Sequence, residues 1–135
     1  MSPMTPAVAQ TITGKYLSLT SYRRDATGVA TPVWFVEEDG RLLVETDGES
    51  FKVRRIRANP YVTIRTCTVR GRPLSEPIAA RAELLPESEV ARVEPLFGRK
   101  YRLDLALTKP IRWVLRKLHV GRPRGQSVIV AITPT

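Results

Sequence analysis

An Asp-Gly pair between two apolar segments places the strongest constraint on how this chain folds. Residues 29–36 (VATPVWFV) and 41–46 (RLLVET) are rich in β-branched and aromatic side chains, and Asp39-Gly40 lies between them. The Asp-Gly dipeptide favours the positive φ angles of a tight hairpin turn. We therefore expect two antiparallel strands joined by this turn.

Four more segments have strand character. In residues 16–22, Leu17 and Leu19 alternate with polar side chains, which is the period of a half-buried strand. This segment and the hairpin predict a three-strand antiparallel meander. Six short strands joined mostly by turns, with few helices, predict a mainly β protein built on a closed or nearly closed six-stranded antiparallel barrel. The remaining predicted strands are residues 61–69, 78–85 and 127–133.

Three segments predict short helices that flank the barrel. Residues 51–59 follow Ser50, a favourable N-cap, and stop before a proline. Residues 86–97 begin with a proline and acidic side chains, and we expect Pro95 to bend or end that helix. Residues 108–118 carry apolar side chains at helical spacing.

The length of 135 residues suits one domain. Residues 1–14 are rich in Thr, Pro and Ala and predict a flexible N-terminal arm before a domain at 15–135. Cys67 is the single cysteine, so an intrachain disulfide and a multi-thiolate metal site are excluded. No segment approaches the roughly 18 apolar residues of a membrane span, and the first residues lack a signal-peptide pattern. We expect a cytoplasmic protein without a membrane span.

The charge balance indicates an anionic partner. The chain has 22 Lys and Arg against 13 Asp and Glu, a net charge of +9. Nucleic acid, an anionic membrane surface and a polyanionic small molecule would each satisfy that charge. The arginines are scattered and no RRM, helix-turn-helix or zinc-finger pattern appears, so we expect no nucleic-acid partner.

Basic side chains lie on both sides of the predicted helix 51–59. On a helical wheel, Lys52 and Arg55 lie on one side of the apolar stripe, and Arg54 and Arg57 lie on the other. A helix N-terminus presents unpaired N–H groups and partial positive charge, so the first pair and the capping serine predict an anion site. The alternative is a solvated basic helix face.

The order of these elements resembles a known superfamily. A strand, an Asp-Gly hairpin, a strand ending in Thr and a Ser-x-Lys helix start are similar to the FMN-binding split-barrel superfamily, which includes pyridoxamine 5′-phosphate oxidase. Residues 15–64 resemble in particular its PPOX-class F420-dependent oxidoreductases, and the similarity extends over about 120 residues. The resemblance implies a six-stranded split barrel with a few short flanking helices, which forms a cofactor-binding domain at 15–135. It also implies a homodimer with the cofactor site at the subunit interface.

The resemblance also implies cofactor contacts at the helix start. In relatives the phosphate of FMN or F420 is held there, and the matching positions are Thr46, Ser50, Lys52 and Arg55. Phe51 departs from the family pattern, which has a small residue at this position. Its ring would crowd the path of the cofactor tail or cover the cofactor ring.

The isoalloxazine or deazaflavin ring of relatives lies along the second strand. A protein nucleophile is not required for hydride transfer, and no catalytic residue is identified. Cys67 fits strand packing better than a reactive thiolate, and His119 fits a contact at a helix C-terminus. Trp113 and Tyr101 either line a substrate mouth or pack. The implied ring contacts are Thr31, Pro32, Val33 and Trp34.

The function implied is that of an F420-binding oxidoreductase that transfers hydride between F420 and an unidentified small-molecule substrate. F420 carries a phosphodiester and an oligoglutamate tail, so it is more anionic than FMN and fits the basic composition better. Arg54, Arg57 and the loop 119–126 either contact that tail or are plain surface charge. Two alternatives stay open: an FMN-binding protein of the pyridoxamine-phosphate-oxidase type, and a non-catalytic F420 or lipid carrier on the same fold.

Overall fold

The computed structural model describes residues 12, 14–102 and 127–135. The predicted helix 108–118, the loop 119–126 and most of the predicted arm lie outside these residues. In chain order the elements are β1 (Tyr16–Tyr22), β2 (Gly28–Val33), β3 (Val36–Glu38), β4 (Arg41–Asp47), α2 (Phe51–Ala58), β5 (Tyr61–Cys67), β6 (Ile78–Leu84), α3 (Glu89–Lys100) and β7 (Ser127–Pro134).

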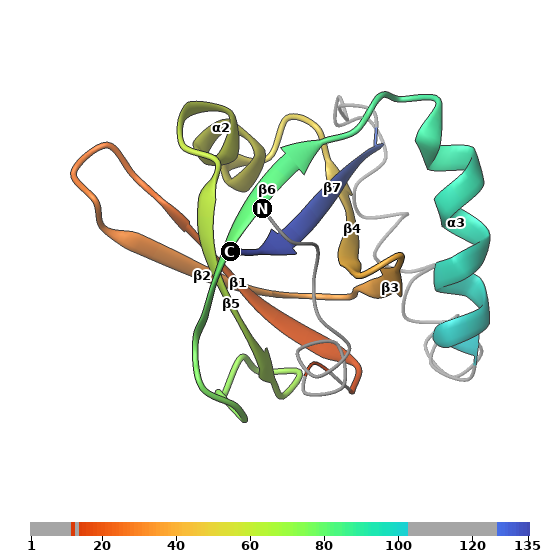
Figure 1. Ribbon diagram of the computed structural model, residues 1–135, viewed down its shortest axis with the longest axis horizontal. Coiled ribbons are helices and arrows are strands. Elements are labelled where there is room, and N and C mark those ends of the chain that lie inside the picture. Colours follow the sequence, from red (N-terminus) through yellow and green to blue (C-terminus); the bar gives the residue numbers. More distant parts are fainter. Residues whose placement is uncertain (1–11, 13, 103–126) are drawn as a thin grey trace, which may run out of the picture.

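The strands form one curled antiparallel sheet with the order β2-β1-β5-β6-β7-β4-β3 (Figure 1). The strands β2 and β3 are consecutive in the chain and yet lie at opposite edges of this sheet. The continuous segment 28–38 therefore runs from one edge to the other, and this is how the curled sheet closes on itself. The architecture agrees with the predicted antiparallel barrel, with seven strands in place of six.

The predicted strand 29–36 is interrupted, and Phe35 explains why. Its N–H donates to the Tyr101 hydroxyl at 2.9 Å, and its carbonyl oxygen accepts from Lys100 Nζ at 2.8 Å and lies 2.8 Å from the same hydroxyl. Side chains at the end of α3 thus take both backbone groups, so the strand ladder stops there. The first half of the predicted strand pairs with β1 and the second half with β4. The six-strand count was wrong for this reason.

The predicted Asp-Gly hairpin is confirmed. Asp39 and Gly40 have φ angles of 53° and 78°, and the flanking residues Glu38 and Arg41 pair across the strands. Two successive positive φ angles are those of a type I′ turn, whose twist matches that of the strands it joins. This turn fixes the register of β3 on β4.

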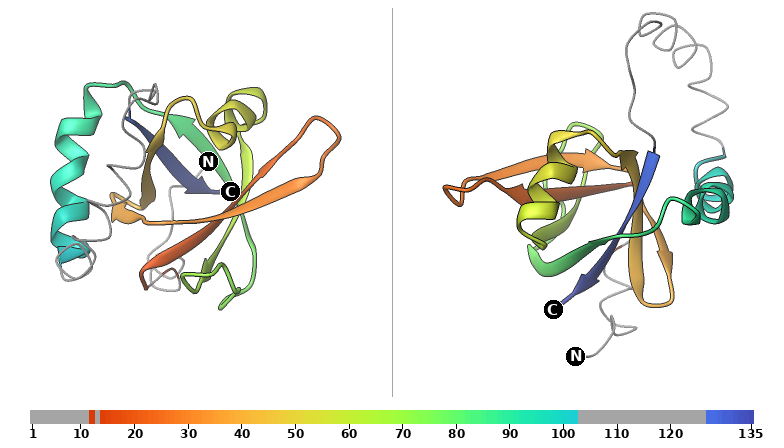
Figure 2. Two further views of the ribbon diagram at one scale, coloured as in Figure 1. Left: turned by 180° about the vertical axis from the view of Figure 1, so that it is seen from behind. Right: turned by 90° about the horizontal axis from the view of Figure 1, so that it is seen from above.

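Two hydrophobic clusters lie on opposite faces of the sheet. Along β4, Leu42 and Val44 belong to the main cluster and Leu43 belongs to the second, because successive strand side chains point to opposite faces. The main cluster includes Ile12, three residues before the predicted domain start at Lys15. The second cluster lies under α3, which contacts β7, β3 and β4 (Figure 2).

The helix α3 differs from its prediction at both ends. It begins three residues later than expected, at Glu89, and continues through Pro95 to Lys100, so of the two predicted effects of Pro95, a bend or an end, the end does not occur. Proline removes one backbone hydrogen bond in a helix. Val93 and Phe97, on either side of Pro95, are both buried in the second cluster, and their packing offsets that loss. In the part of the chain described, no helix has the length and apolar composition needed to cross a membrane.

Candidate functional site

The predicted helix after β4 is confirmed as α2, and its start is well defined. Ser50 is the N-cap, with extended backbone angles, and its Oγ accepts a hydrogen bond from the Val53 N–H at 3.4 Å. The helix buries Val53 and Ile56, as predicted, and ends at Ala58, with Asn59 as its C-cap just before Pro60. Because Ser50 Oγ acts here as an acceptor, its O–H can still donate to a ligand.

Thr46 and Lys52 meet beside this helix start. The ammonium group of Lys52 donates to Thr46 Oγ1 at 3.0 Å. Burial lowers the pKa of Lys52, the positive charge of Arg55 lowers it further, and the carboxylate of Asp47 acts weakly in the opposite direction. Among the residues that the structure describes, no carboxylate forms an ion pair with Lys52. The Thr46–Lys52 pair is therefore a half-buried positive charge whose bonded partner is neutral.

Arg55 lies one turn further along α2. Its Nε donates to Ser21 Oγ at 2.7 Å, and Ser21 is fully buried on β1. The bond attaches α2 to β1 and orients the guanidinium close enough to Lys52 to affect its pKa. Sequence reasoning missed Ser21, because no local pattern distinguishes it from the other polar residues of β1.

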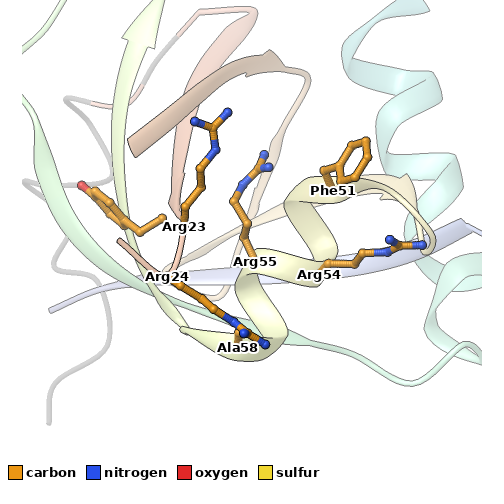
Figure 3. A pocket seen from close by; sticks show the side chains of 7 residues that line it. Arg23, Arg24, Phe51, Arg54, Arg55 and Ala58 are labelled. Atoms are coloured by element: carbon orange, nitrogen blue, oxygen red, sulfur yellow. The ribbon is translucent and has the colours of Figure 1, made fainter. Parts of the chain in front are cut away.

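A pocket of about 370 Å³ lies between α2 and the end of β1 (Figure 3). Both Arg54 and Arg55 line it, although the helical wheel places them on opposite sides of the apolar stripe. The pocket lies on the solvent side of α2, where those two sides meet. Arg57 does not line it. We call it the arginine pocket, and it is lined by Tyr22, Arg23, Arg24, Phe51, Arg54, Arg55 and Ala58.

Phe51 lies in the wall of the arginine pocket. Its side chain is exposed, at 73%, and the Arg54 guanidinium carbon lies 5.6 Å from the centroid of its ring. The ring is therefore not packed into the protein core. Its large exposed apolar surface faces the pocket instead.

The predicted ring contacts Thr31, Pro32 and Val33 lie on β2. This strand pairs with β1 along one edge, and no described strand pairs with its other edge. A proline suits such an edge strand because it has no N–H to offer to a neighbour. The outer edge of β2 thus presents backbone groups that a planar ligand could contact.

Trp34 packs under α3. Its ring stacks on the ring of Tyr101, with centroids 4.2 Å apart and an interplanar angle of 4°, and it packs against the cluster under α3. One face of the Trp34 ring is therefore occupied, and the fully buried Tyr101 packs rather than lining a substrate mouth.

Cys67 and Lys100 are further candidates for reactive side chains. Cys67 is buried and its burial raises the pKa of the thiol, which agrees with packing. Lys100 was not singled out from the sequence. Its Nζ lies 3.4 Å from the centroid of the Phe35 ring, and burial lowers the pKa of Lys100 to about 8. His119 and Trp113 lie outside the described residues.

Comparison with known proteins identifies the fold. No protein-family model matches the chain, and no curated protein matches its sequence. An F420 reductase is similar in structure, at 19% identity and a TM-score of 0.57, over 94% of this chain and 91% of that one. A pyridoxamine 5′-phosphate oxidase-related, FMN binding protein from Nostoc punctiforme matches at 17% identity and a TM-score of 0.55, over 99% of this chain and 81% of that one. HutZ, the heme storage protein from Vibrio cholerae, matches at 14% identity and a TM-score of 0.61, over 99% and 92%. The chain therefore has the fold of the pyridoxamine 5′-phosphate oxidase-like proteins.

Proposed function

We propose that the protein is an F420-binding oxidoreductase that transfers hydride between F420 and an unidentified small-molecule substrate. One observation carries this proposal. The half-buried ammonium of Lys52, at the start of α2, has only a neutral hydroxyl as its bonded side-chain partner in the described structure. Removing a charge from water costs free energy unless the charge is paired, so this half-buried position suits an anion.

The donors around the start of α2 fit a phosphate group. Lys52 Nζ, Thr46 Oγ1 and the Ser50 hydroxyl can each donate to a phosphate oxygen, and the helix N-terminus favours negative charge. Arg55 would add a guanidinium from one turn further along. A bound phosphate would give the Lys52 ammonium a negatively charged acceptor in addition to the neutral Thr46 hydroxyl. These four residues are the proposed phosphate clamp.

The net charge favours F420 over FMN within this clamp. Both cofactors carry a phosphate, but F420 has additional carboxylates in its tail, and the chain has a net charge of +9. FMN remains the second candidate, since one similar structure is an FMN binding protein. The clamp itself does not distinguish the two.

The chain's own residues would bind and orient the cofactor. When bound, F420 supplies the hydride chemistry. The clamp would hold its phosphate, and the free edge of β2 at Thr31, Pro32 and Val33 would contact the ring through backbone groups. The exposed part of Trp34 would exclude water from one end of the ring site. We expect a homodimer in which the second subunit completes this site.

A non-catalytic carrier on the same fold is the rival class. One protein of similar structure is named a heme storage protein, and one fold can serve different functions, which supports a carrier as the rival. The clamp would serve a carrier equally well. Only turnover separates the two functions.

A fluorescence titration of the purified protein with F420 and with FMN tests the proposal. We expect F420 to bind more tightly. Reduced F420 should then be oxidised with at least one acceptor among quinones, tetrapyrroles and unsaturated carbonyl compounds. Tighter binding of FMN would overturn the choice of cofactor, and F420 binding without turnover across this panel would favour the carrier.

A further inference from the structure

The arginine pocket concentrates positive charge with no acidic side chain in its lining. Four of its seven lining residues are arginines: Arg23, Arg24, Arg54 and Arg55. Within the described part of the chain, none of these guanidinium groups forms an ion pair with a carboxylate. Four like charges around one small pocket repel each other unless an anion compensates them.

The backbone that carries these arginines is ordered on both sides of the pocket. In the turn after β1, the Arg23 N–H donates to Thr27 O and the Ala26 N–H donates to Arg23 O, each at 2.9 Å. On α2, the bond from Arg55 to the buried Ser21 fixes one guanidinium. Figure 3 shows the Arg23 and Arg55 side chains extending in the same direction from the two elements. One of the four guanidinium groups, that of Arg55, is therefore held in place before a ligand arrives.

The pocket and the Thr46–Lys52 pair lie on different sides of α2. At roughly 100° per residue, the lining residues Phe51, Arg54, Arg55 and Ala58 centre opposite the buried face of the helix. Lys52 projects roughly 100° away from that direction. A ligand in the pocket would approach α2 from the side opposite its buried face. Arg55 lies between the pocket and the Thr46–Lys52 pair.

We propose that the arginine pocket binds a small molecule that carries two or more closely spaced oxyanions, either phosphates or carboxylates. Guanidinium groups bind such oxyanions through pairs of parallel hydrogen bonds, and four of them exceed what one phosphate needs. The volume of about 370 Å³ lies within the range of small-molecule sites, about 300–1,000 Å³. The exposed ring of Phe51 provides an apolar wall for the rest of the molecule. This proposal does not depend on the proposed oxidoreductase function, although Arg55 belongs both to the pocket lining and to the proposed clamp.

Isothermal titration calorimetry of the full chain with pyrophosphate and with orthophosphate tests the site. We expect one pyrophosphate per chain, bound more tightly than orthophosphate. Arg24→Gln and Arg54→Gln should each weaken pyrophosphate binding by about tenfold or more, since each removes a charge-assisted contact. Arg57→Gln is the matched control: Arg57 is exposed on the same helix, outside the pocket, and its loss changes the net charge equally. Equal weakening in all three variants, or no pyrophosphate binding at low salt, would overturn the site.

Competition with F420 identifies where the oxyanions come from. If they belong to a separate ligand, pyrophosphate and F420 bind at the same time. If they are the carboxylates of a cofactor tail, pyrophosphate competes with tailed F420 and not with a form that lacks the tail, and Arg24→Gln weakens only the tailed form. Both results support the pocket as a polyanion site. Failure of F420 and FMN to bind would overturn the proposed function and leave the pyrophosphate result standing.

Discussion

The Tyr101 hydroxyl accepts a hydrogen bond from the Phe35 N–H at 2.9 Å and lies 2.8 Å from the Phe35 carbonyl oxygen. It also lies 2.8 Å from Lys15 O. A residue at the end of α3 thus takes the backbone groups that would otherwise extend a strand. This contact separates β2 from β3, and the two strands lie at opposite edges of the sheet.

Removing that hydroxyl should destabilise the fold. Tyr101→Phe leaves the buried Phe35 N–H without its partner, which costs about 1–3 kcal/mol. We expect the free energy of unfolding from urea denaturation to fall by this amount. Tyr61→Phe removes a hydroxyl from an exposed tyrosine and should change stability by less than about 0.5 kcal/mol. Equal effects of the two substitutions would contradict the role given to Tyr101.

Glu45 on β4 should make the stability dependent on pH. Burial raises its pKa above the ordinary value of 4.5, and the nearby charge of Glu94 raises it further. The folded state therefore holds this proton more tightly than the unfolded state, so stability falls as pH rises from about 4.5 through the folded pKa. Above that pKa the charged carboxylate is unfavourable.

Glu45→Gln should accordingly stabilise the protein at pH 7 by about 0.2–1 kcal/mol, the range for partly exposed charge interactions. The gain should vanish below pH 4.5. Urea denaturation at both pH values measures it. Glu83→Gln, at an exposed position on β6, serves as the control. If Glu45→Gln stabilised the protein equally at acidic pH, the gain would not come from removing the charge of the Glu45 carboxylate.

The ammonium group of Lys100 should lose its proton at a lower pH in the folded protein than in the unfolded chain. Burial lowers its pKa from 10.5 to about 8, so unfolding takes up a proton between these values and stability rises with pH across that interval. Only the neutral amine reacts with acylating reagents. The rate of Lys100 acylation, followed by mass spectrometry, should reach half its maximum near pH 8 in the native protein and well above that pH in urea. Identical pH profiles of acylation in the native protein and in urea would contradict the lowered pKa of Lys100.

Ser50 offers a test that separates helix capping from ligand binding. Aspartate caps a helix about as well as serine, so Ser50→Asp should leave the free energy of unfolding within about 0.5 kcal/mol of the wild type. The new negative charge should repel a phosphate at the helix start and weaken F420 binding by about tenfold or more. Ser50→Ala should instead lower stability by about 1 kcal/mol. Unchanged F420 affinity in the aspartate variant would remove Ser50 from the clamp.

The features predicted correctly from the sequence depend on neighbouring residues. The Asp39-Gly40 turn, the Ser50 cap and the end of α2 before Pro60 each follow from the chemistry of a few adjacent positions. These three features can be predicted without information about the rest of the chain. Local propensity was therefore sufficient for the hairpin and for the helix that carries Lys52.

The features missed depend on residues far away in the chain. The strand interruption at Phe35 is caused by Tyr101, 66 residues later, and the partner of Arg55 is Ser21, 34 residues earlier. The continuation of α3 through Pro95 depends on packing against the sheet. The arginine pocket combines a turn after β1 with one face of α2. No periodicity within either segment indicates that they meet.

The Lys52 side chain provides the most direct test of the proposed clamp. Lys52→Met keeps most of the apolar stem and removes the charge, while Arg57→Gln removes one charge from the exposed side of the same helix. We expect a fluorescence titration to show F420 affinity lower by roughly tenfold to a hundredfold in Lys52→Met, which corresponds to the loss of about 1.5–3 kcal/mol from a charge-assisted hydrogen bond. The Arg57→Gln variant should bind within about threefold of the wild type. Equal F420 affinities for Lys52→Met and the wild-type protein would contradict the phosphate clamp.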